Sequence, residues 1–263
     1  IVLLVSLLST AMTKTLGVIP ARMSSSRFPG KPLENILDIP MIAHCYERAA
    51  ISEACDYLVI ATPDDEIMEW ANSFNIPAIL TSDAHERATE RAAEVVSILE
   101  SNGQFFEYIL LLQGDEPQIN PLDINKLNNA FHDFNSEVVN LVYPIDEEDM
   151  ADENVVKAIL TNSNSINFFT RAHVPHRSKS GMRQLGMIGF SSQALKTYDQ
   201  LEMTALEILE SIDMMRFIEN DISIQGVLSS SPILGVDRPG DIQKAELMMA
   251  NDSLVKDYQF KYL

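Results

Sequence analysis

The residues most suited to chemistry lie in the loop at 20–33, which directly follows the short apolar run 16–19. Arg22, Arg27 and Lys31 place three cations in this loop, together with three serines and no acid. A strand that ends in such a loop, punctuated by proline and glycine, brings backbone N–H groups, guanidiniums and an ammonium to one edge of a sheet, where they can surround phosphate oxygens. We therefore predict a polyphosphate-binding loop, with a solvated surface loop as the alternative.

This loop does not follow the common glycine-rich phosphate motifs. A P-loop requires a glycine five residues before Gly30 and a serine or threonine after Lys31, whereas the sequence has Ser25 and Pro32 at these positions. No Gly-x-Gly-x-x-Gly run occurs either. Any phosphate binding here must therefore use a different loop type.

Two aspartates are candidates for holding a metal ion. Asp115 follows the strongest apolar run, 108–112, and Asp237 lies in the turn 235–239 before an expected helix. Carboxylates at two such transitions could converge on one divalent cation. The alternatives are a turn residue for Asp115 and a helix N-cap for Asp237.

The composition limits the classes of partner. The 263 residues contain 19 Lys plus Arg against 38 Asp plus Glu, a formal net charge of −19, which argues against a general nucleic-acid binder or a protein that binds anionic membranes. An anionic substrate therefore needs a local cationic site, and binding of a polyphosphate by so acidic a protein suggests a divalent cation such as Mg²⁺ as a charge mediator. The two cysteines, Cys45 and Cys55, have no metal-site spacing, so reduced residues that fill the core are expected.

The N-terminal apolar run 1–8 resembles a signal peptide in part, but it lacks a basic region and an initiating Met before it. It is also shorter than the about 20 apolar residues that cross a bilayer. We interpret 1–11 as a non-native or disordered leader, 12–263 as a single domain, and the location as cytoplasmic.

From residue 16 onward, short apolar runs alternate with helical periodicity, which indicates an α/β fold with a mostly parallel sheet flanked by helices. The expected strands are 16–19, 57–61, 78–80 and 108–112. One helix is expected to begin after Pro40, and two others are expected at 64–74 and 89–99. Ligand sites lie beyond the carboxyl ends of such strands. The loop at 20–33 and Asp115 are therefore expected at the same edge.

Beyond residue 135 the pattern changes to strands with few long helices between them. This indicates a mixed or antiparallel extension of the same domain, which is a candidate dimer interface. The expected strands are 138–143, 155–160, 166–170, 184–191 and 222–228, and the expected helices are 204–218 and 239–249.

Together these segments resemble the 3-deoxy-manno-octulosonate cytidylyltransferases, the CMP-KDO synthetases, over about residues 14–250. The likeness is strongest in 19–33, 89–96, 113–117, 206–207 and 235–239. It implies a nucleotidyltransferase fold, usually dimeric, that uses CTP, Mg²⁺ and an acidic 3-deoxy sugar. The reaction implied is attack of the sugar's anomeric hydroxyl on the α-phosphorus of CTP with release of pyrophosphate, for lipopolysaccharide synthesis.

The resemblance also implies residue roles. The nucleotide-binding residues would be Pro20, Ala21, Arg22, Ser25, Arg27, Lys31, Arg91 and Gln113, and the metal ligands Asp115 and Asp237. The catalytic residues would be Arg22, Lys31, Asp115 and Asp237, and the sugar-binding positions Arg171, Gln184, Ile188, Asp213 and Met214.

The chain departs from the family pattern mainly where the sugar is expected. Gln184 and Ile188 replace a usual histidine and tyrosine, and Asp213 and Met214 replace a usual glutamate and glutamine. In the cytosine region, the pair Arg87-Ala88 replaces a usual Ser-Gly. We therefore expect an acceptor that is either KDO or a modified relative such as 8-amino-8-deoxy-KDO.

Carboxylates of Glu210 and Asp213 could bind an ammonium on such an acceptor, with a helix-surface role as the alternative. Two other functions stay open: cytidylyl transfer to another acid, of the sialic type or a phosphonate, and a catalytically silent nucleotide-binding homologue. No nucleic acid or membrane partner is expected, and the chain is expected to form a homodimer.

Overall fold

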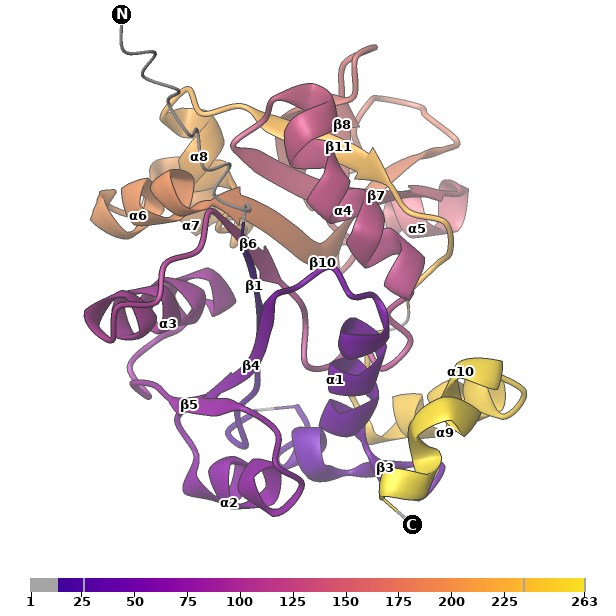
Figure 1. The fold of residues 1–263 in the computed structure, drawn as a ribbon. Coiled ribbons are helices and arrows are strands. Elements are labelled where there is room, and N and C mark those ends of the chain that lie inside the picture. The colour runs from indigo at the N-terminus through magenta and orange to yellow at the C-terminus, as the bar shows by residue number, and fades with distance from the viewer. Residues whose placement is uncertain (1–13, 26, 234, 263) are drawn as a thin grey trace, which may run out of the picture.

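A central nine-stranded sheet organises the described part of the chain (Figure 1). The computed structural model describes residues 14–25, 27–233 and 235–262, so the leader expected at 1–11 lies outside the described residues. The strand order is β5-β4-β1-β6-β10-β7-β11-β9-β8. An α/β fold is thereby confirmed, with a parallel half at the β5 end and a mixed half beyond β6.

The parallel half consists of β5, β4, β1 and β6, whose neighbours all run in the same direction. Successive residues point to opposite faces, so that Leu16 and Val18 of β1 join one buried apolar cluster and Ile19 joins the other. Burial on both faces explains the continuous apolar runs in the sequence. The bounds are Thr15–Pro20 for β1, Tyr57–Thr62 for β4, Ala78–Leu80 for β5 and Tyr108–Leu111 for β6.

The mixed half begins with β10, the long strand that runs antiparallel to both β6 and β7. β11 is parallel to β7, and β9 and β8 complete this half in antiparallel pairings. The expected mixed extension is thus continuous with the parallel half through β10. The bounds are Val138–Ile145 for β7, Lys157–Leu160 for β8, Ser165–Thr170 for β9, Gly181–Ser191 for β10 and Ile224–Leu228 for β11.

Helices cover both faces of the sheet (Figure 1). One face packs against α3, α6 and α8, and the other against α1, α2 and α4. The bounds are Met41–Ile51 for α1, Asp65–Ser73 for α2, Ala88–Ser101 for α3, Pro121–Phe134 for α4, Glu147–Ala151 for α5, Ser192–Gln200 for α6, Ala205–Glu210 for α7 and Met215–Glu219 for α8.

The single helix expected at 204–218 is wrong, because α7 and α8 are separate helices. Ser211 adopts a left-handed conformation with φ 54° and ends α7. The chain bend lets Arg216 form a buried bidentate pair with Glu207, with both N–O distances 2.7 Å. In one continuous helix, residues nine apart would be about 13.5 Å apart along the axis, too far for this contact.

The C-terminal segment packs back onto α1. It contains α9 (Pro239–Met249), α10 (Ser253–Tyr258) and the 3₁₀ turn Gln259–Lys261, and its apolar side chains share a cluster with α1 and the hairpin β2 (Asn35–Ile36) and β3 (Ile39–Pro40). Both cysteines are free. Within the described residues, no helix has the length and apolar character needed to span a membrane.

His44 of α1 is fully buried in this contact. Its Nε2 lies 2.8 Å from the carbonyl oxygen of Ile36 and its Nδ1 2.7 Å from the hydroxyl of Tyr258. The carbonyl can only accept, so Nε2 carries the proton, and Nδ1 accepts from the hydroxyl in a neutral ring. Burial is the main reason that the pKa of His44 is lowered to about 4.

We expect His44 to make the protein less stable as the pH falls. Between about pH 6.5 and 4 the unfolded chain binds a proton at this residue and the folded chain does not, so the free energy of unfolding falls by about 1.4 kcal/mol per pH unit. In urea unfolding followed by circular dichroism, His44→Gln should remove about 2 kcal/mol of the stability difference between pH 7 and 5. The control is His132→Gln at an exposed position, which should leave the stability difference between pH 7 and 5 unchanged. An equal effect of the two substitutions would show that His44 is not the source of the pH dependence.

Candidate active site

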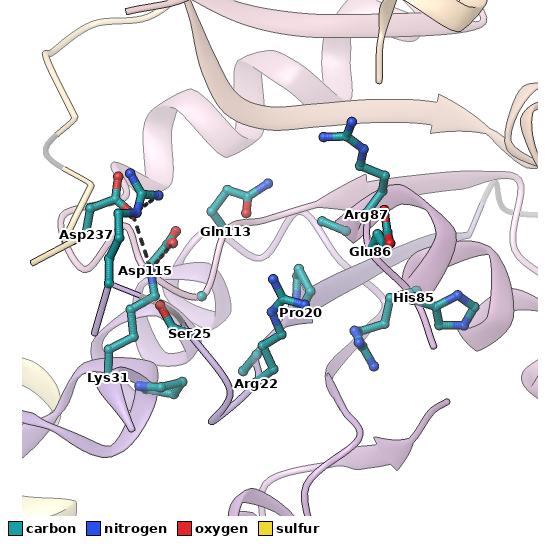
Figure 2. Close-up of a pocket in the computed structure, with 16 residues that line it drawn as sticks. Pro20, Arg22, Ser25, Lys31, His85, Glu86, Arg87, Gln113, Asp115 and Asp237 are labelled. Carbon is teal, nitrogen blue, oxygen red and sulfur yellow. Dashed lines mark hydrogen bonds and ion pairs between the residues drawn. The ribbon is translucent and has the colours of Figure 1, made fainter. Parts of the chain in front are cut away.

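A cavity of about 280 Å³ lies at the carboxyl ends of β1 and β6 (Figure 2). It is the edge that the sequence predicted. All the residues expected to bind nucleotide or metal line this cavity: Pro20, Ala21, Arg22, Ser25, Arg27, Lys31, Arg91, Gln113, Asp115 and Asp237. The structure thus brings the basic loop and both aspartates together, while their roles stay predictions.

The basic loop after β1 is held by its own backbone and by Asp64, the residue before α2. Gly30, in a left-handed conformation with φ 78°, donates its N–H to the carbonyl of Met23 at 2.9 Å. The N–H of Met23 in turn donates to Asp64 at 2.8 Å. A side chain at position 30 would be strained in this conformation, so glycine suits the turn that aims Lys31 into the cavity.

Lys31 joins three distant parts of the chain. Its Nζ lies 2.6 Å from Asp115 Oδ2, 3.6 Å from Asp237 Oδ1 and 3.1 Å from the carbonyl of Val236. Arg27 adds a second cation 2.9 Å from Asp237 Oδ1. Figure 2 shows Lys31, Asp115 and Asp237 together on one side of the cavity, with dashed lines marking the ion pairs. The backbone N–H of Val236 donates to the carbonyl of Asp115 at 2.9 Å. The two carboxylates are therefore neighbours, bridged by an ammonium.

The two carboxylates fit a magnesium ion. Mg²⁺ is bound by one or two carboxylates, with phosphates and water completing its coordination, and not by an all-protein cage. In the part of the chain that the structure describes, no cluster of three or more His, Cys, Asp or Glu side chains is arranged to hold a metal. The position of the Lys31 ammonium shows that a cation is favourable beside both carboxylates, while their role as metal ligands stays a prediction.

A bulge in β10 forms another part of the site. The β7–β10 register shifts between Gln184 and Ile188. Within the bulge, Gln113 Nε2 donates to the carbonyl of Gly186 at 3.0 Å, and the Gly186 N–H donates to Glu116 at 3.3 Å. Burial, and secondly the charge of Asp115, raises the pKa of Glu116 to about 8. The end of β6 and the bulge are therefore fixed to each other.

The opposite wall of the cavity comes from the loop between β5 and α3 and from the start of α3. Arg91 of α3 is buried there and donates to the Thr81 hydroxyl and, at 2.9 Å, to the carbonyl of Ser82 in the loop. Burial is the main reason that its pKa is lowered, followed by the charge of Arg22. Arg87 and Ala88, which the resemblance puts in the cytosine region, also line the cavity, and four further lining residues were not predicted: Pro32, His85, Glu86 and Gly114. The loop at 81–87 could have been predicted as part of the site, because it follows the expected strand 78–80 at the same edge of the sheet.

The five predicted sugar-binding residues do not line this cavity. Ile188 and Met214 are buried in the apolar cluster on the α3 face. Gln184 donates to Asn140 Oδ1 at 2.8 Å beside the bulge. Arg171 is held by Glu210, whose carbonyl accepts from Nε at 2.8 Å and whose carboxylate accepts the Arg171 N–H at 2.8 Å. The sugar role of these residues stays a prediction.

Asp213 is engaged with the start of α3. Its Oδ2 accepts a hydrogen bond from the Thr89 hydroxyl at 2.7 Å, and burial raises the pKa of its carboxyl. This contact links the expected sugar side to the loop that forms the far wall of the cavity. Asp213 is thus close to the site although it does not line it.

The sequence is similar to known cytidylyltransferases over most of its length. A cytidylyltransferase family model matches residues 16–224. The 3-deoxy-manno-octulosonate cytidylyltransferase of Parabacteroides distasonis is 32% identical over 255 residues, covering 91% of this chain and 100% of that protein. The enzyme of the same name from Oleidesulfovibrio alaskensis is 36% identical over 236 residues, covering 88% and 94%.

Solved structures agree with the fold. A CMP:2-keto-3-deoxy-manno-octonic acid synthetase complexed with CTP superposes with a TM-score of 0.86 at 31% identity, covering 91% of this chain and 100% of that one. A putative glucose-1-phosphate thymidylyltransferase from Bacillus anthracis has a TM-score of 0.69 at 16% identity, covering 90% and 96%. The second likeness shows the fold alone.

The contact at Gly186 gives a direct test of how the bulge supports the site. A Cβ at this position would lie 2.3 Å from Gln113 Cγ and 2.8 Å from Glu116 Oε1, so Gly186→Ala must displace both side chains. We expect a loss of about 1 to 3 kcal/mol in the free energy of unfolding, measured with urea. Gly240→Ala is the matched control, because nothing lies within 4 Å of its added Cβ. Equal stability of the two variants would show that the bulge is loosely held.

Proposed function

The chain belongs to the cytidylyltransferase family and is a nucleotidyltransferase, and from this premise we propose that it transfers CMP from CTP to the anomeric hydroxyl of a 3-deoxy-octulosonic acid. The observation that carries the proposal is the contact of Lys31 with Asp115 and Asp237 in the cavity where every predicted nucleotide residue meets. The names of its relatives support the same acceptor class. The product would be a CMP-sugar, and pyrophosphate would be released.

The chemistry asked of the protein is mainly positioning. The oxygen of the anomeric hydroxyl forms a bond to the α-phosphorus, and the bond from that phosphorus to the oxygen bridging the β-phosphate breaks. The hydroxyl proton passes to solvent, and pyrophosphate leaves with the bridging oxygen. Arg22 and Lys31 would hold the departing phosphates, because cations placed in advance stabilise charge that develops there.

Asp115 and Asp237 are the residues that would hold Mg²⁺. Bound there, the ion would neutralise phosphate charge and lower the pKa of the attacking hydroxyl. Arg27 Nη2 lies 2.9 Å from Asp237 Oδ1 and Lys31 Nζ lies 2.6 Å from Asp115 Oδ2, so each carboxylate already attracts a cation at this place. Their contacts support this part of the proposal.

For the acceptor, we propose KDO or its 8-amino-8-deoxy analogue. The support is the departure from the family pattern: Ile188 and Met214 are apolar where that pattern has hydrogen-bonding groups expected for sugar hydroxyls, and Gln184 and Asp213 replace a histidine and a longer acid. Carboxylates of Glu210 and Asp213 lie near Arg171 and Thr89 on that side of the molecule. A CMP-activated KDO is a glycosyl donor, which suits a role in lipopolysaccharide synthesis. We also propose that the protein acts in the cytoplasm and as a homodimer.

The substrate proposal is tested by pyrophosphate release from CTP and Mg²⁺ with a panel of KDO, 8-amino-8-deoxy-KDO, a sialic acid and a phosphonate. We expect turnover with one or both octulosonic acids and little with the other two. A preference for the sialic acid or the phosphonate would replace the acceptor named here, and no turnover with any acid would refute the proposed reaction.

The metal proposal is tested by Asp115→Asn, which keeps the side-chain size and removes the charge. We expect kcat to fall by about 100-fold or more, and the dependence of the rate on Mg²⁺ concentration to shift upward. Asp133→Asn, at an exposed position of α4, is the matched control and should behave as the wild type. Unchanged kcat and Mg²⁺ dependence in Asp115→Asn would exclude this residue as a metal ligand.

A further inference from the structure

The bulge in β10 contains more chain than its partner strand can pair. Asn140 of β7 pairs with Ile188 and Val142 pairs with Gln184, so that β7 advances by two residues where β10 advances by four. The surplus residues of a bulge leave the regular hydrogen-bonding ladder, and a buried carbonyl outside the ladder needs another donor. The bulge can therefore hold its shape only if other groups supply donors to it.

The side-chain amide of Asn140 supplies such donors. Asn140 is fully buried, and its Nδ2 donates to the carbonyl oxygens of Leu185 at 2.9 Å and Met187 at 3.1 Å. Nδ2 also lies 3.1 Å from the carbonyl oxygen of Leu141, so its two protons are shared among three acceptors. The Oδ1 atom accepts from Gln184 Nε2 at 2.8 Å. One buried amide thus fastens the whole bulge to β7.

Gly186, between the two carbonyls that Asn140 holds, is where the bulge meets the cavity wall. Its own carbonyl accepts from Gln113 Nε2 at 3.0 Å, and its N–H donates to Glu116 at 3.3 Å. The contact binds the nitrogen end of the Gln113 amide, so Oε1 is the end that remains for a hydrogen-bond donor of a ligand. The position of the bulge therefore sets both the place and the orientation of this amide.

Gln113 lines the cavity, whereas Asn140 does not. Figure 2 shows Gln113 between Asp115 on one side of the cavity and Arg87 on the other. Asn140 can reach a ligand in this cavity only through Gly186 and Gln113, by two successive sets of hydrogen bonds. Any role of Asn140 in binding must therefore disappear when Gln113 is removed.

We propose that Asn140 is a positioning residue for the nucleotide: by holding the β10 bulge, it fixes the Gln113 amide in the orientation that binds CTP, and the inference rests on the function proposed above. Asparagine is disfavoured in strands, and burying an amide is unfavourable unless its hydrogen bonds are made. The neighbouring residues of β7, Val139 and Leu141, are buried and apolar. A polar residue among them is explained by the bulge that it holds.

The test is a double-mutant cycle of Asn140→Leu and Gln113→Leu, with the Kd of CTP measured by calorimetry in the presence of Mg²⁺ and without an acid acceptor. We expect Asn140→Leu to weaken CTP binding about three- to tenfold, because Gln113 loses its fixed position. In protein that already carries Gln113→Leu, the same change should alter the Kd less than about twofold. The cycle is repeated with Asn140→Thr, which suits a strand and keeps one hydroxyl donor, so that it should fold even if Asn140→Leu does not and should weaken binding to a smaller extent.

Leu99→Ala is the control for lost stability alone. Leu99 is buried near the end of α3, about 12 Å along the helix from Arg91, so this substitution should destabilise the fold and leave the Kd of CTP unchanged. The inference would be overturned by an equal loss of affinity with and without Gln113→Leu, by an unchanged Kd in the Asn140 variants, or by a loss in Leu99→Ala as large as that in Asn140→Leu. Wild-type protein that binds no CTP would refute the proposed function, and the inference with it, whereas CTP binding that neither Asn140 nor Gln113 affects would refute the inference alone.

Discussion

The ammonium of Lys31 between Asp115 and Asp237 is the contact on which the site depends. It joins the first loop, the end of β6 and the segment before α9, and Arg27 adds a second contact to Asp237. Two carboxylates brought together without a cation would repel each other, and the backbone contact of Val236 with Asp115 would then have to hold them. The fold brings the three segments close to one another, and attraction between Lys31 and the two carboxylates then holds them together at the cavity.

The two sides of the cavity are joined by a small number of polar contacts. Gln113 and Glu116 hold the β10 bulge at Gly186, and Thr89 holds Asp213 at the bend between α7 and α8. That bend exists because the chain must return Arg216 to Glu207 inside the apolar core, where either charge alone would be strongly unfavourable. A buried ion pair therefore shapes the region expected to contact the acid.

Sequence reasoning found what depends on local pattern. The parallel strands were predicted because burial on both faces gives continuous apolar runs, and α9 was predicted at its observed bounds, 239–249, because Pro239 begins it. The helix α4 was overlooked, although Asn120 and Pro121 form a typical start. The break at Ser211 was not predicted, because helical periodicity does not show the buried pair between Glu207 and Arg216 that accompanies it. Residue types identified the phosphate loop and the aspartates, but Arg87 stood out only as a departure from the family pattern until the cavity showed its place.

The wide sequence separation of the residues in the site has a consequence for how the protein is made. The contact of Lys31 with Asp115 spans 84 residues, and that of Arg27 with Asp237 spans 210. Such contacts form late, because the loss of chain entropy in closing long loops precedes any gain from the contact. During synthesis the sheet can assemble from the N-terminal side, whereas the site is completed only after Asp237 has left the ribosome. A chain truncated just before Asp237 would retain all the described strands, the last of which ends at Leu228, and would lack the second carboxylate.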